Sequence, residues 1–226
     1  MLYVVPTPIG NLEDLSARAL RTLREVRAIY CEDTRRTRKL LAHHGLGTPL
    51  IRYQDRDERS VERILSRLAA GEDLALVSDS GTPVISDPGL RLVALARARD
   101  LPVCPLPGPC AAATAVAGSG LPGDAFVFLG FLPRSRSKQR RALEAAAAMG
   151  KTIVVYESPY RVLNLLGRAE EALGADAQAV ACRELSKVHE EWLTGSVGGV
   201  RRVLESRGKL LGEFVLMFHP AGRRAA

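Results

Sequence analysis

Three loops of this sequence are rich in glycine, proline and hydroxyl side chains, and each follows a short apolar segment. They span residues 6–11, 77–89 and 107–112. In open α/β sheets small molecules bind beyond the carboxyl ends of the strands, where backbone amides, glycines and helix starts converge. The three loops therefore predict a site for one large ligand.

A fourth polar group, residues 183–191, contains Glu184 and Lys187 directly after another apolar segment. Either side chain is a candidate general base. A general base contributes roughly 10²–10⁴-fold, whereas positioning two reactants supplies effective molarities of about 10⁵–10⁸ M, so the chemistry need not depend on one base. His43, His44 and His189 have no matched partner in the sequence, and we expect them to be surface or loop residues.

Basic residues dominate the charge of the chain, with a formal net charge of +7 and a sequence pI of about 9.6. This balance favours an anionic partner such as nucleic acid, although an arginine-rich genome would produce it too. The densest cluster has no acidic residue among its members, which are Arg134, Arg136, Lys138, Arg140 and Arg141; a second cluster consists of Arg35, Arg36, Arg38 and Lys39. The first cluster predicts phosphate contacts, and its alternative is a solvated loop and first helical turn.

Several classes of site are not predicted, because their motifs are missing from the sequence. There is no GxGxxG after the first strand, no GxxxxGK[ST] and no GxSxG, which argues against a Rossmann cofactor site, a P-loop and a nucleophile elbow. The four cysteines are far apart and form no CxxC pair, so we expect neither a metal site nor a disulfide. No apolar run approaches the ~18 residues of a membrane span and no signal-like N-terminal segment is present, so we expect a cytoplasmic protein.

Strands and helices alternate along the chain, which predicts an α/β fold with mainly parallel pairing in its first half. Strands are expected at residues 2–5, 28–31, 74–77, 103–106, 126–129, 152–156, 179–183, 191–194 and 214–218. Apolar residues at helical spacing predict helices around residues 15–26, 61–68 and 162–173, the last with Ser158 as its N-cap. The one junction dense in glycine and proline is 118–124, so we predict domains at 1–120 and 121–220 and a tail at 221–226.

Five motifs of the chain occur in the same order as in a known family. They are LYVVPTPIGNL at residues 2–12, EDTR at 32–35, SDSGTPVISDPG at 78–89, GFLP at 130–133 and YESPYR at 156–161. Through these motifs the chain resembles the ribosomal small-subunit methyltransferase I family of the tetrapyrrole methylase superfamily, from residue 2 to about residue 218.

The resemblance implies a two-domain, tetrapyrrole-methylase-like α/β fold of the class III methyltransferase type, with the cofactor cleft between the domains. It also implies a protein that is commonly a homodimer. It implies an enzyme that uses S-adenosyl-L-methionine, without a metal ion, to 2′-O-methylate a cytidine ribose in the 16S rRNA of the small ribosomal subunit. Members of the family often carry a short basic helical extension that the printed sequence lacks. We therefore expect RNA binding to rest on the first basic cluster, on the dimer or on the ribosomal particle.

Carried over by position, the family's cofactor contacts fall on Ile9, Gly10, Asp79, Ser80, Gly81, Thr82, Cys110 and Ala111, and more weakly on Tyr156 and Glu213. Small residues would let backbone amides approach the adenine and the carboxylate of the cofactor. Asp79 would hold ribose hydroxyl groups or face the sulfonium. Its alternative is a cap of its own loop that accepts hydrogen bonds from neighbouring amides.

For this reaction, the charge and placement of the residues predict RNA contacts at the first basic cluster, at Arg35 and at Arg161, and Glu184 or Lys187 as the group that takes the proton of the ribose hydroxyl. Two of these assignments have local alternatives. The EDTR segment either positions the acceptor nucleotide or starts a helix with Asp33 or Thr34 as its cap. Arg161 contacts phosphate or pairs with Glu157.

Two rival functions stay open at this point. One is a tetrapyrrole C-methyltransferase of the precorrin or porphyrin type, which needs no basic surface, and the first basic cluster argues against it. The other is a non-catalytic RNA-binding assembly factor, against which the cofactor loops argue.

Overall fold

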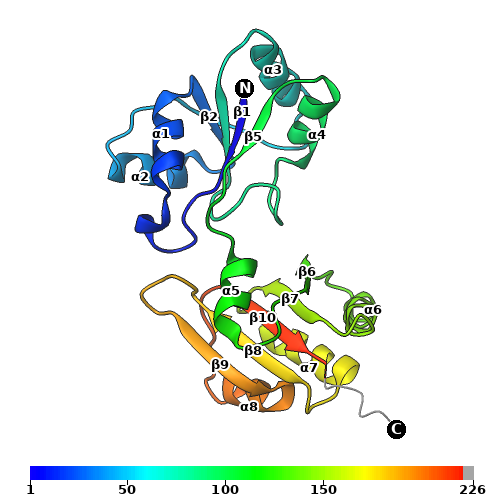
Figure 1. Cartoon of the computed structure of the whole chain (residues 1–226). Helices are drawn as coiled ribbons and strands as arrows, with labels where there is room; N and C mark the ends of the chain where they lie inside the picture. The colour runs from blue at the N-terminus through cyan, green and yellow to red at the C-terminus, as the bar shows by residue number, and fades with distance from the viewer. Residues whose placement is uncertain (221–226) are drawn as a thin grey trace. The chain divides into compact units, whose positions relative to one another are not determined.

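The computed structural model describes residues 1–220, so the predicted tail at 221–226 lies outside the described residues. The chain forms two compact units, Met1–Cys110 and Ala111–Ala226 (Figure 1). The sequence places the junction at 118–124, after helix α5 (Ala111–Ser119), whereas the division in the structure precedes this helix. Helix α5 packs against strands β7 (Thr152–Glu157) and β10 (Phe214–His219), which explains why it belongs to the second unit.

The first unit is built on a parallel five-stranded sheet with the order β3-β2-β4-β1-β5. Its elements are β1 (Leu2–Val5), the short 3₁₀ helix η1 (Leu12–Asp14), α1 (Ala17–Glu25), β2 (Ala28–Cys31), α2 (Thr34–His43), β3 (Leu50–Arg52), α3 (Glu58–Ala69), β4 (Leu74–Val77), α4 (Leu90–Ala98) and β5 (Val103–Pro105). The predicted parallel pairing is confirmed. All strands point the same way, so the loops that follow them emerge at one edge of the sheet.

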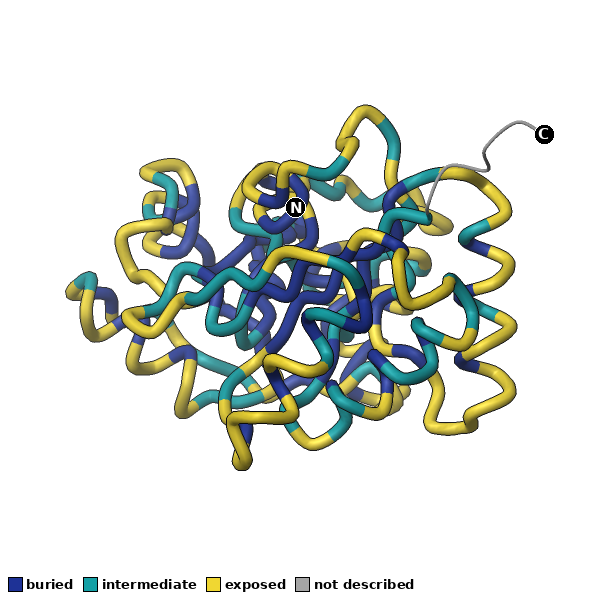
Figure 2. The backbone as a smooth tube through the Cα atoms, turned by 90° about the horizontal axis from the view of Figure 1, so that it is seen from below, coloured by how far each residue is buried: buried dark blue, intermediate teal, exposed yellow. Residues whose placement is uncertain are grey.

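Both faces of this sheet are buried, because successive side chains of a strand point to opposite faces. Ile29 belongs to the apolar cluster that includes Leu23 of α1, while the next residue, Tyr30, belongs to the cluster of Ile64 and Leu92 on the other face. Figure 2 colours every described residue by its burial. The rigid, two-sided core fixes the strand ends from which the polar loops start.

The second unit contains a mixed sheet with the order β6-β7-β10-β8-β9. Its remaining elements are β6 (Phe126–Phe131), α6 (Arg136–Ala147), α7 (Val162–Leu173), β8 (Gln178–Arg183), β9 (Glu191–Ser196) and α8 (Val197–Glu205). Strands β6 and β7 are parallel, and the other pairs are antiparallel. The loops after β6 and β7 therefore leave the sheet at the same edge.

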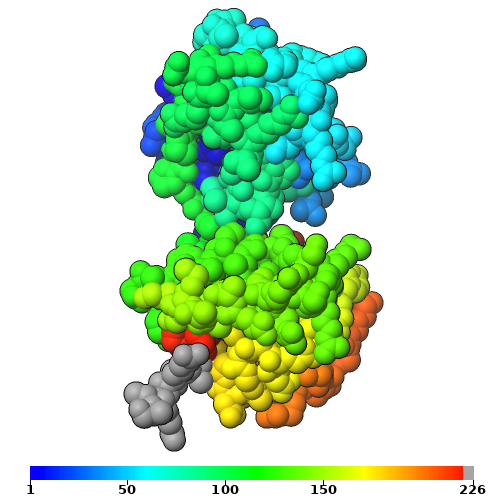
Figure 3. All heavy atoms as spheres, turned by 90° about the vertical axis from the view of Figure 1, so that its right-hand side faces the viewer, coloured from blue at the N-terminus to red at the C-terminus, as the bar shows by residue number. Residues whose placement is uncertain are grey.

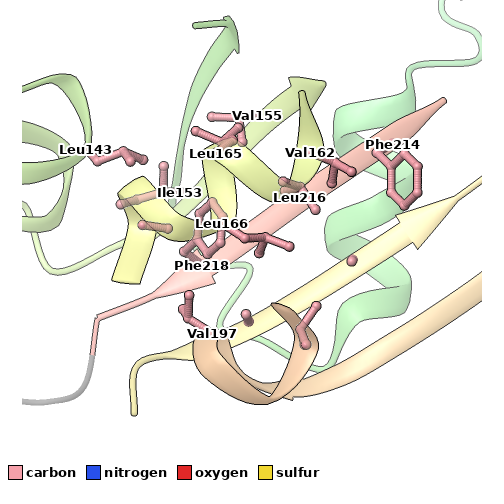
Figure 4. Close-up of a cluster of buried hydrophobic side chains, with 14 of the residues drawn as sticks. Leu143, Ile153, Val155, Val162, Leu165, Leu166, Val197, Phe214, Leu216 and Phe218 are labelled. Atoms are coloured by element: carbon pink, nitrogen blue, oxygen red, sulfur yellow. The ribbon is translucent and has the colours of Figure 1, made fainter. Parts of the chain in front are cut away.

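One apolar cluster holds the second unit together (Figure 4). Leu143 of α6, Leu165 of α7 and Phe218 of β10 each have 0% of their surface exposed. Burial of one such side chain stabilises the fold by about 1.5–3 kcal/mol. Helix α7 begins at Val162 with Arg161 at the N-cap position, so the prediction of Ser158 as its cap was wrong. Residues 158–161 instead form a turn closed by the carbonyl of Ser158, which accepts from the N–H groups of Arg161 and Val162.

Candidate functional site

The loops that follow β1 and β4 are joined by a small antiparallel bridge. Thr7 N–H donates to Gly81 O at 2.9 Å, and Gly81 N–H donates to Thr7 O at 3.0 Å. Two buried hydroxyl groups reinforce the bridge: Thr7 Oγ1 donates to Ser78 O at 3.1 Å, and Ser78 Oγ donates to Gly81 O at 2.7 Å. The backbone of residues 78–81 is thereby fixed against the first loop.

The loop after β5 joins the same group. Thr82 Oγ1 donates to Pro109 O at 2.8 Å. A Cβ atom at Gly81 would lie 3.3 Å from Cγ2 of Ile9 and 3.7 Å from Pro109 O, and one at Gly108 would lie 2.7 Å from Cβ of Pro6. Gly81 also has a φ of +83°, which favours glycine. The structure therefore brings the three predicted loops together at one edge of the first sheet, in contacts that require glycine.

A pocket of about 130 Å³ opens at this edge. Thr7, Ser78 and Asp79 line it from the strand ends, and Arg36 and Lys39 line it from α2. Sites for whole cofactors usually enclose about 300–1,000 Å³, so this pocket accommodates part of such a molecule.

Asp79, at the end of β4, reaches across to the end of β2. Its Oδ1 accepts the backbone N–H of Asp33 at 3.2 Å. The hydrogen bond joins two strand ends rather than two parts of one loop, so it differs from the local cap that the sequence offered as the alternative. The carboxylate is half-buried and lines the pocket.

A second carboxylate, Asp87, was missed by the sequence analysis. Burial, followed by the negative charges of Glu32 and Asp79, raises the pKa of Asp87 from its ordinary value of 3.8 to about 6. The loop places it there through an unusual backbone: Val84 has a φ of 76° and Ser86 a φ of 62°. Positive φ at a β-branched residue is a genuine outlier that costs about 1–3 kcal/mol. The loop thus brings Asp87 close enough to Glu32 and Asp79 for their negative charges to interact, and Asp79 lines the pocket.

The EDTR segment starts helix α2, as the capping alternative predicted. Asp33 is the N-cap and its Oδ1 accepts the N–H of Arg35 at 2.8 Å. The Arg35 guanidinium pairs with the same carboxylate at 3.3 Å and holds the pKa of Asp33 below its usual range. The Arg35 side chain is 85% exposed, so it remains accessible to an anionic partner.

In the second unit, Glu184, Lys187 and Glu213 lie together although they are distant in sequence. Lys187 Nζ donates to Glu184 Oε1 at 2.9 Å and to Glu213 Oε2 at 2.8 Å, and the backbone N–H of Glu213 donates to Glu184 Oε1 at 2.8 Å. The two candidate bases and one weakly predicted cofactor residue thus form a single ionic network.

This network changes the chemical roles of its members. Burial favours the neutral form of Glu184 and would raise its pKa. The hydrogen bonds that Glu184 accepts from Lys187 and from the Glu213 N–H outweigh this effect, so the pKa of Glu184 is lowered. Burial likewise opposes the charge of Lys187, but the hydrogen bonds to Glu213 and Glu184 prevail and raise the pKa of Lys187. A lysine held protonated cannot accept a proton near neutral pH, so the geometry argues against Lys187 as the base and makes Glu184 a weak one.

Tyr156 lies beside the start of α5, next to another predicted cofactor residue, Ala111. The Tyr156 hydroxyl accepts the N–H of Ala112 at 2.9 Å. Its ring makes edge contacts with Phe128 and Phe131, with centroids 4.8 and 5.5 Å apart. These contacts fix the phenol at the carboxyl end of β7.

The first basic cluster lies on α6 and the turn before it, and all five side chains belong to exposed residues. Arg136 pairs with Glu171 at 2.7 Å, and Arg140 pairs with Glu144 at 3.3 Å. Arg134, Lys138 and Arg141 have no carboxylate within ion-pair distance among residues 1–220. The helix therefore carries both neutralised and available cations.

Arg161 occupies the local ion pair that the sequence offered as its alternative. Its guanidinium lies 3.1 Å from Oε2 of the buried Glu157 and donates to Leu132 O at 2.8 Å. Its structural contacts make it a link between two loops rather than an available phosphate ligand.

Three further observations on residues 1–220 concern metal sites, cysteines and membrane spans. No group of three or more His, Cys, Asp or Glu side chains is placed to hold a metal ion. All four cysteines are free thiols. No described helix combines the length and apolar character needed to cross a membrane.

A family model described as tetrapyrrole (corrin/porphyrin) methylases matches residues 1–200 of the chain. The chain belongs to the tetrapyrrole methylase family. A relative of this methylase from Pseudomonas aeruginosa, named ribosomal RNA small subunit methyltransferase I, is 47% identical over 84% of the chain and 67% of its own length. A protein of the same name from Hydrogenobaculum sp. is 44% identical over 96% of the chain and 94% of its own length.

Solved structures share the fold of this methylase at low sequence identity. Diphthine synthase superimposes with a TM-score of 0.74 at 14% identity, covering 96% of this chain and 89% of its own. Uroporphyrin-III C-methyl transferase from Thermus thermophilus, complexed with S-adenyl homocysteine, gives a TM-score of 0.65 at 17% identity, with 96% of each chain covered. The predicted class III methyltransferase fold is confirmed.

Proposed function

We propose that this methylase transfers a methyl group from S-adenosyl-L-methionine to the ribose 2′-oxygen of a cytidine in the 16S rRNA of the small ribosomal subunit. The observation that carries the proposal is the similarity to proteins named ribosomal RNA small subunit methyltransferase I, which extends over both units. The solved structures named as precorrin-4 or uroporphyrin methyltransferases are far less similar to this chain, at 14–19% identity.

The tied loops of the first unit fit the proposed cofactor. S-adenosylmethionine supplies an electrophilic methyl group on a sulfonium cation. Backbone groups of the close-packed loops at Ile9, Gly10, Ser80, Gly81, Thr82 and Cys110 would contact it, and the half-buried Asp79 would accept hydrogen bonds from its ribose hydroxyl groups. The neighbouring carboxylates of Glu32 and Asp87 favour its positive charge. Ala111 and Tyr156 remain candidates from the second unit.

The ionic network of the second unit would position the acceptor ribose. Lys187 is a fixed donor and Glu184 a fixed acceptor, each held by Glu213. Glu184 is the candidate to accept the hydroxyl proton, although its lowered pKa makes it a weak base. Most of the acceleration then comes from alignment of the reactants, which supplies effective molarities of about 10⁵–10⁸ M.

The available cations would hold the RNA backbone. Arg134, Lys138 and Arg141 are exposed without carboxylate partners in the described chain, and Arg35 is largely exposed. Each phosphate neutralised on a single strand contributes about −0.7 to the slope of log affinity against log salt. RNA binding should therefore weaken steeply with added salt.

Three further features of the predicted enzyme complete the proposal. They are a homodimer, a reaction without a bound metal ion, and a cytoplasmic location beside its ribosomal substrate. Light scattering of the purified protein tests the first, and full activity in the presence of a chelator tests the second.

A direct test of the activity compares ribosomal RNA with two tetrapyrroles as acceptors of labelled methyl from S-adenosylmethionine. Ribosomal RNA from a strain that lacks this enzyme should accept the label, whereas uroporphyrinogen and precorrin should not. Transfer to a tetrapyrrole alone would replace the RNA proposal. Saturable RNA binding without transfer to any of these acceptors would favour the non-catalytic assembly factor.

A further inference from the structure

Two exposed aromatic side chains lie in neighbouring loops of the second unit. Phe131 ends β6 and is 58% exposed, and Tyr160, in the loop after β7, is 83% exposed. Strands β6 and β7 are parallel, so both loops leave the sheet at the same edge. Exposed apolar side chains that gather at one place on a surface mark a contact site for a ligand or partner.

The two loops are fastened to each other. Arg161, one residue after Tyr160, donates to the carbonyl of Leu132, one residue after Phe131, at 2.8 Å. The guanidinium is held by Glu157, which is only 2% exposed and whose Oε1 also accepts the N–H of Ser158 at 2.8 Å. The aromatic pair is therefore presented by a preorganised backbone.

Phe131 is also held by an edge contact with a neighbouring ring. Its ring meets Tyr156 at an interplanar angle of 65° with centroids 5.5 Å apart, and Tyr156 is itself tied to the N–H of Ala112. An edge contact of this kind holds a ring in place while more than half of the residue stays in solvent.

Unpaired cations follow Phe131 in the chain. Arg134 lies three residues after Phe131, and Lys138 and Arg141 share the solvent side of α6, away from the buried Gln139 and Leu143. Helix α6 lies at the surface in the view of Figure 3, where it is yellow-green. Stacking rings beside phosphate-binding cations are the combination that binds single-stranded nucleic acid.

We propose that Phe131 and Tyr160 form a stacking platform for unpaired bases of single-stranded RNA, with Arg134, Lys138 and Arg141 holding the adjoining phosphates. The proposal rests on the RNA substrate of the proposed function and deepens it. The platform holds the acceptor strand unpaired, so that a ribose can enter the site. The cations make an apolar protein partner a poorer fit, because it would leave their charges uncompensated.

The test measures binding of a fluorescent oligocytidylate of about ten nucleotides to the intact protein. Phe131→Leu and Tyr160→Leu should each weaken binding roughly five- to hundredfold, because each removes one stacking face. Phe131→Tyr and Tyr160→Phe should bind like the unchanged protein. The matched control is Phe126→Leu, at the opposite end of β6, where Phe126 is 40% exposed.

The salt dependence separates stacking from charge. Phe131→Leu and Tyr160→Leu should leave the salt slope unchanged, whereas Lys138→Gln should reduce its magnitude by about 0.7. Affinities of Phe131→Leu and Tyr160→Leu equal to that of Phe126→Leu would overturn the platform. So would a loss of S-adenosylmethionine affinity in Phe131→Leu with RNA affinity retained, because the ring would then serve the cofactor.

Failure of the platform is distinguishable from failure of the proposed function. If the unchanged protein methylates rRNA while both leucine variants bind and react normally, only the platform is refuted. If the oligonucleotide binds with the expected aromatic dependence but no methyl is transferred, the platform stands and the methyltransferase proposal falls. If the unchanged protein neither binds nor methylates RNA, both fall.

Discussion

Replacement of Asp87 by asparagine should stabilise the protein at neutral pH while weakening its cofactor site. Burial and the charges of Glu32 and Asp79 raise the pKa of Asp87 from 3.8 to about 6. The folded state therefore holds this proton more tightly than the unfolded chain does, so the ionised carboxylate destabilises the fold. The contribution of protonated Asp87 to the free energy of unfolding is complete below about pH 4, and it is lost as the pH rises through about 6.

The magnitude follows from the size of that rise. A pKa raised from 3.8 to about 6 corresponds to about 3 kcal/mol, at 1.36 kcal/mol per tenfold change. Part of the side chain is in solvent, which reduces the expected effect to about 1–2 kcal/mol. The asparagine side chain stays neutral, so Asp87→Asn should gain this amount of stability above about pH 7 and nothing near pH 4.

Scanning calorimetry at about pH 4.5 and pH 7.5 measures the effect. Asp87→Asn should raise the melting temperature by about 2–8 °C at the higher pH and hardly at all at the lower one. Asp100→Asn is the matched control, because Asp100 is exposed and its φ of 54° is one that asparagine tolerates. Equal shifts at both pH values, or a shift as large in the control, would refute the assigned cluster of carboxylates.

The same variant should bind S-adenosylmethionine about fivefold more weakly at neutral pH, because one charge facing the sulfonium is lost. In the unchanged protein, affinity for the cofactor should rise as the pH increases through about 6, where Asp87 ionises. A cofactor affinity that is independent of pH and of this substitution would place the sulfonium elsewhere.

Three other substitutions probe the remaining parts of the site. Gly81→Ala should lower cofactor affinity and cost about 1–2 kcal/mol of stability. Gly120 also has a positive φ, +71°, but open space surrounds it. Gly120→Ala should therefore cost only the backbone strain and bind the cofactor normally in calorimetric titration. Lys187→Ala should depress turnover at saturating cofactor with the cofactor dissociation constant unchanged; wild-type turnover would remove it from the mechanism. Lys138→Gln should reduce the salt slope of binding to structured rRNA by about 0.7, whereas Arg136→Gln should change it less, because Glu171 already neutralises Arg136.

Sequence reasoning succeeded where local pattern fixes the structure. The apolar runs at residues 2–5 and 74–77 form parallel strands as predicted, and their glycine- and proline-rich loops meet because parallel strands end at one edge. The short edge strand β3 was missed, since two of its three residues are partly buried, the third is exposed, and the run shows no period. Helix α5 was placed with the first domain because its glycine-rich end suggested a junction, whereas its packing on β7 and β10 is tertiary information.

The site was predicted in outline but not in its chemistry. The position of Asp87 depends on a backbone with positive φ at Val84, which no propensity favours. The role of Lys187 depends on Glu213, 26 residues away, whose carboxylate completes the ion pair that keeps the amine protonated. The exposed Phe131 and Tyr160 gave no periodic signal, and their significance comes from the parallel pairing of β6 and β7.

The most direct test of the central claim is methyl transfer from radiolabelled S-adenosylmethionine to small ribosomal subunits from a strain lacking this enzyme, in parallel with free 16S rRNA, followed by mapping of the label. The proposed function predicts label on one cytidine, at its ribose 2′-oxygen. Label on a base, or no label although the protein binds S-adenosylmethionine tightly, would contradict it.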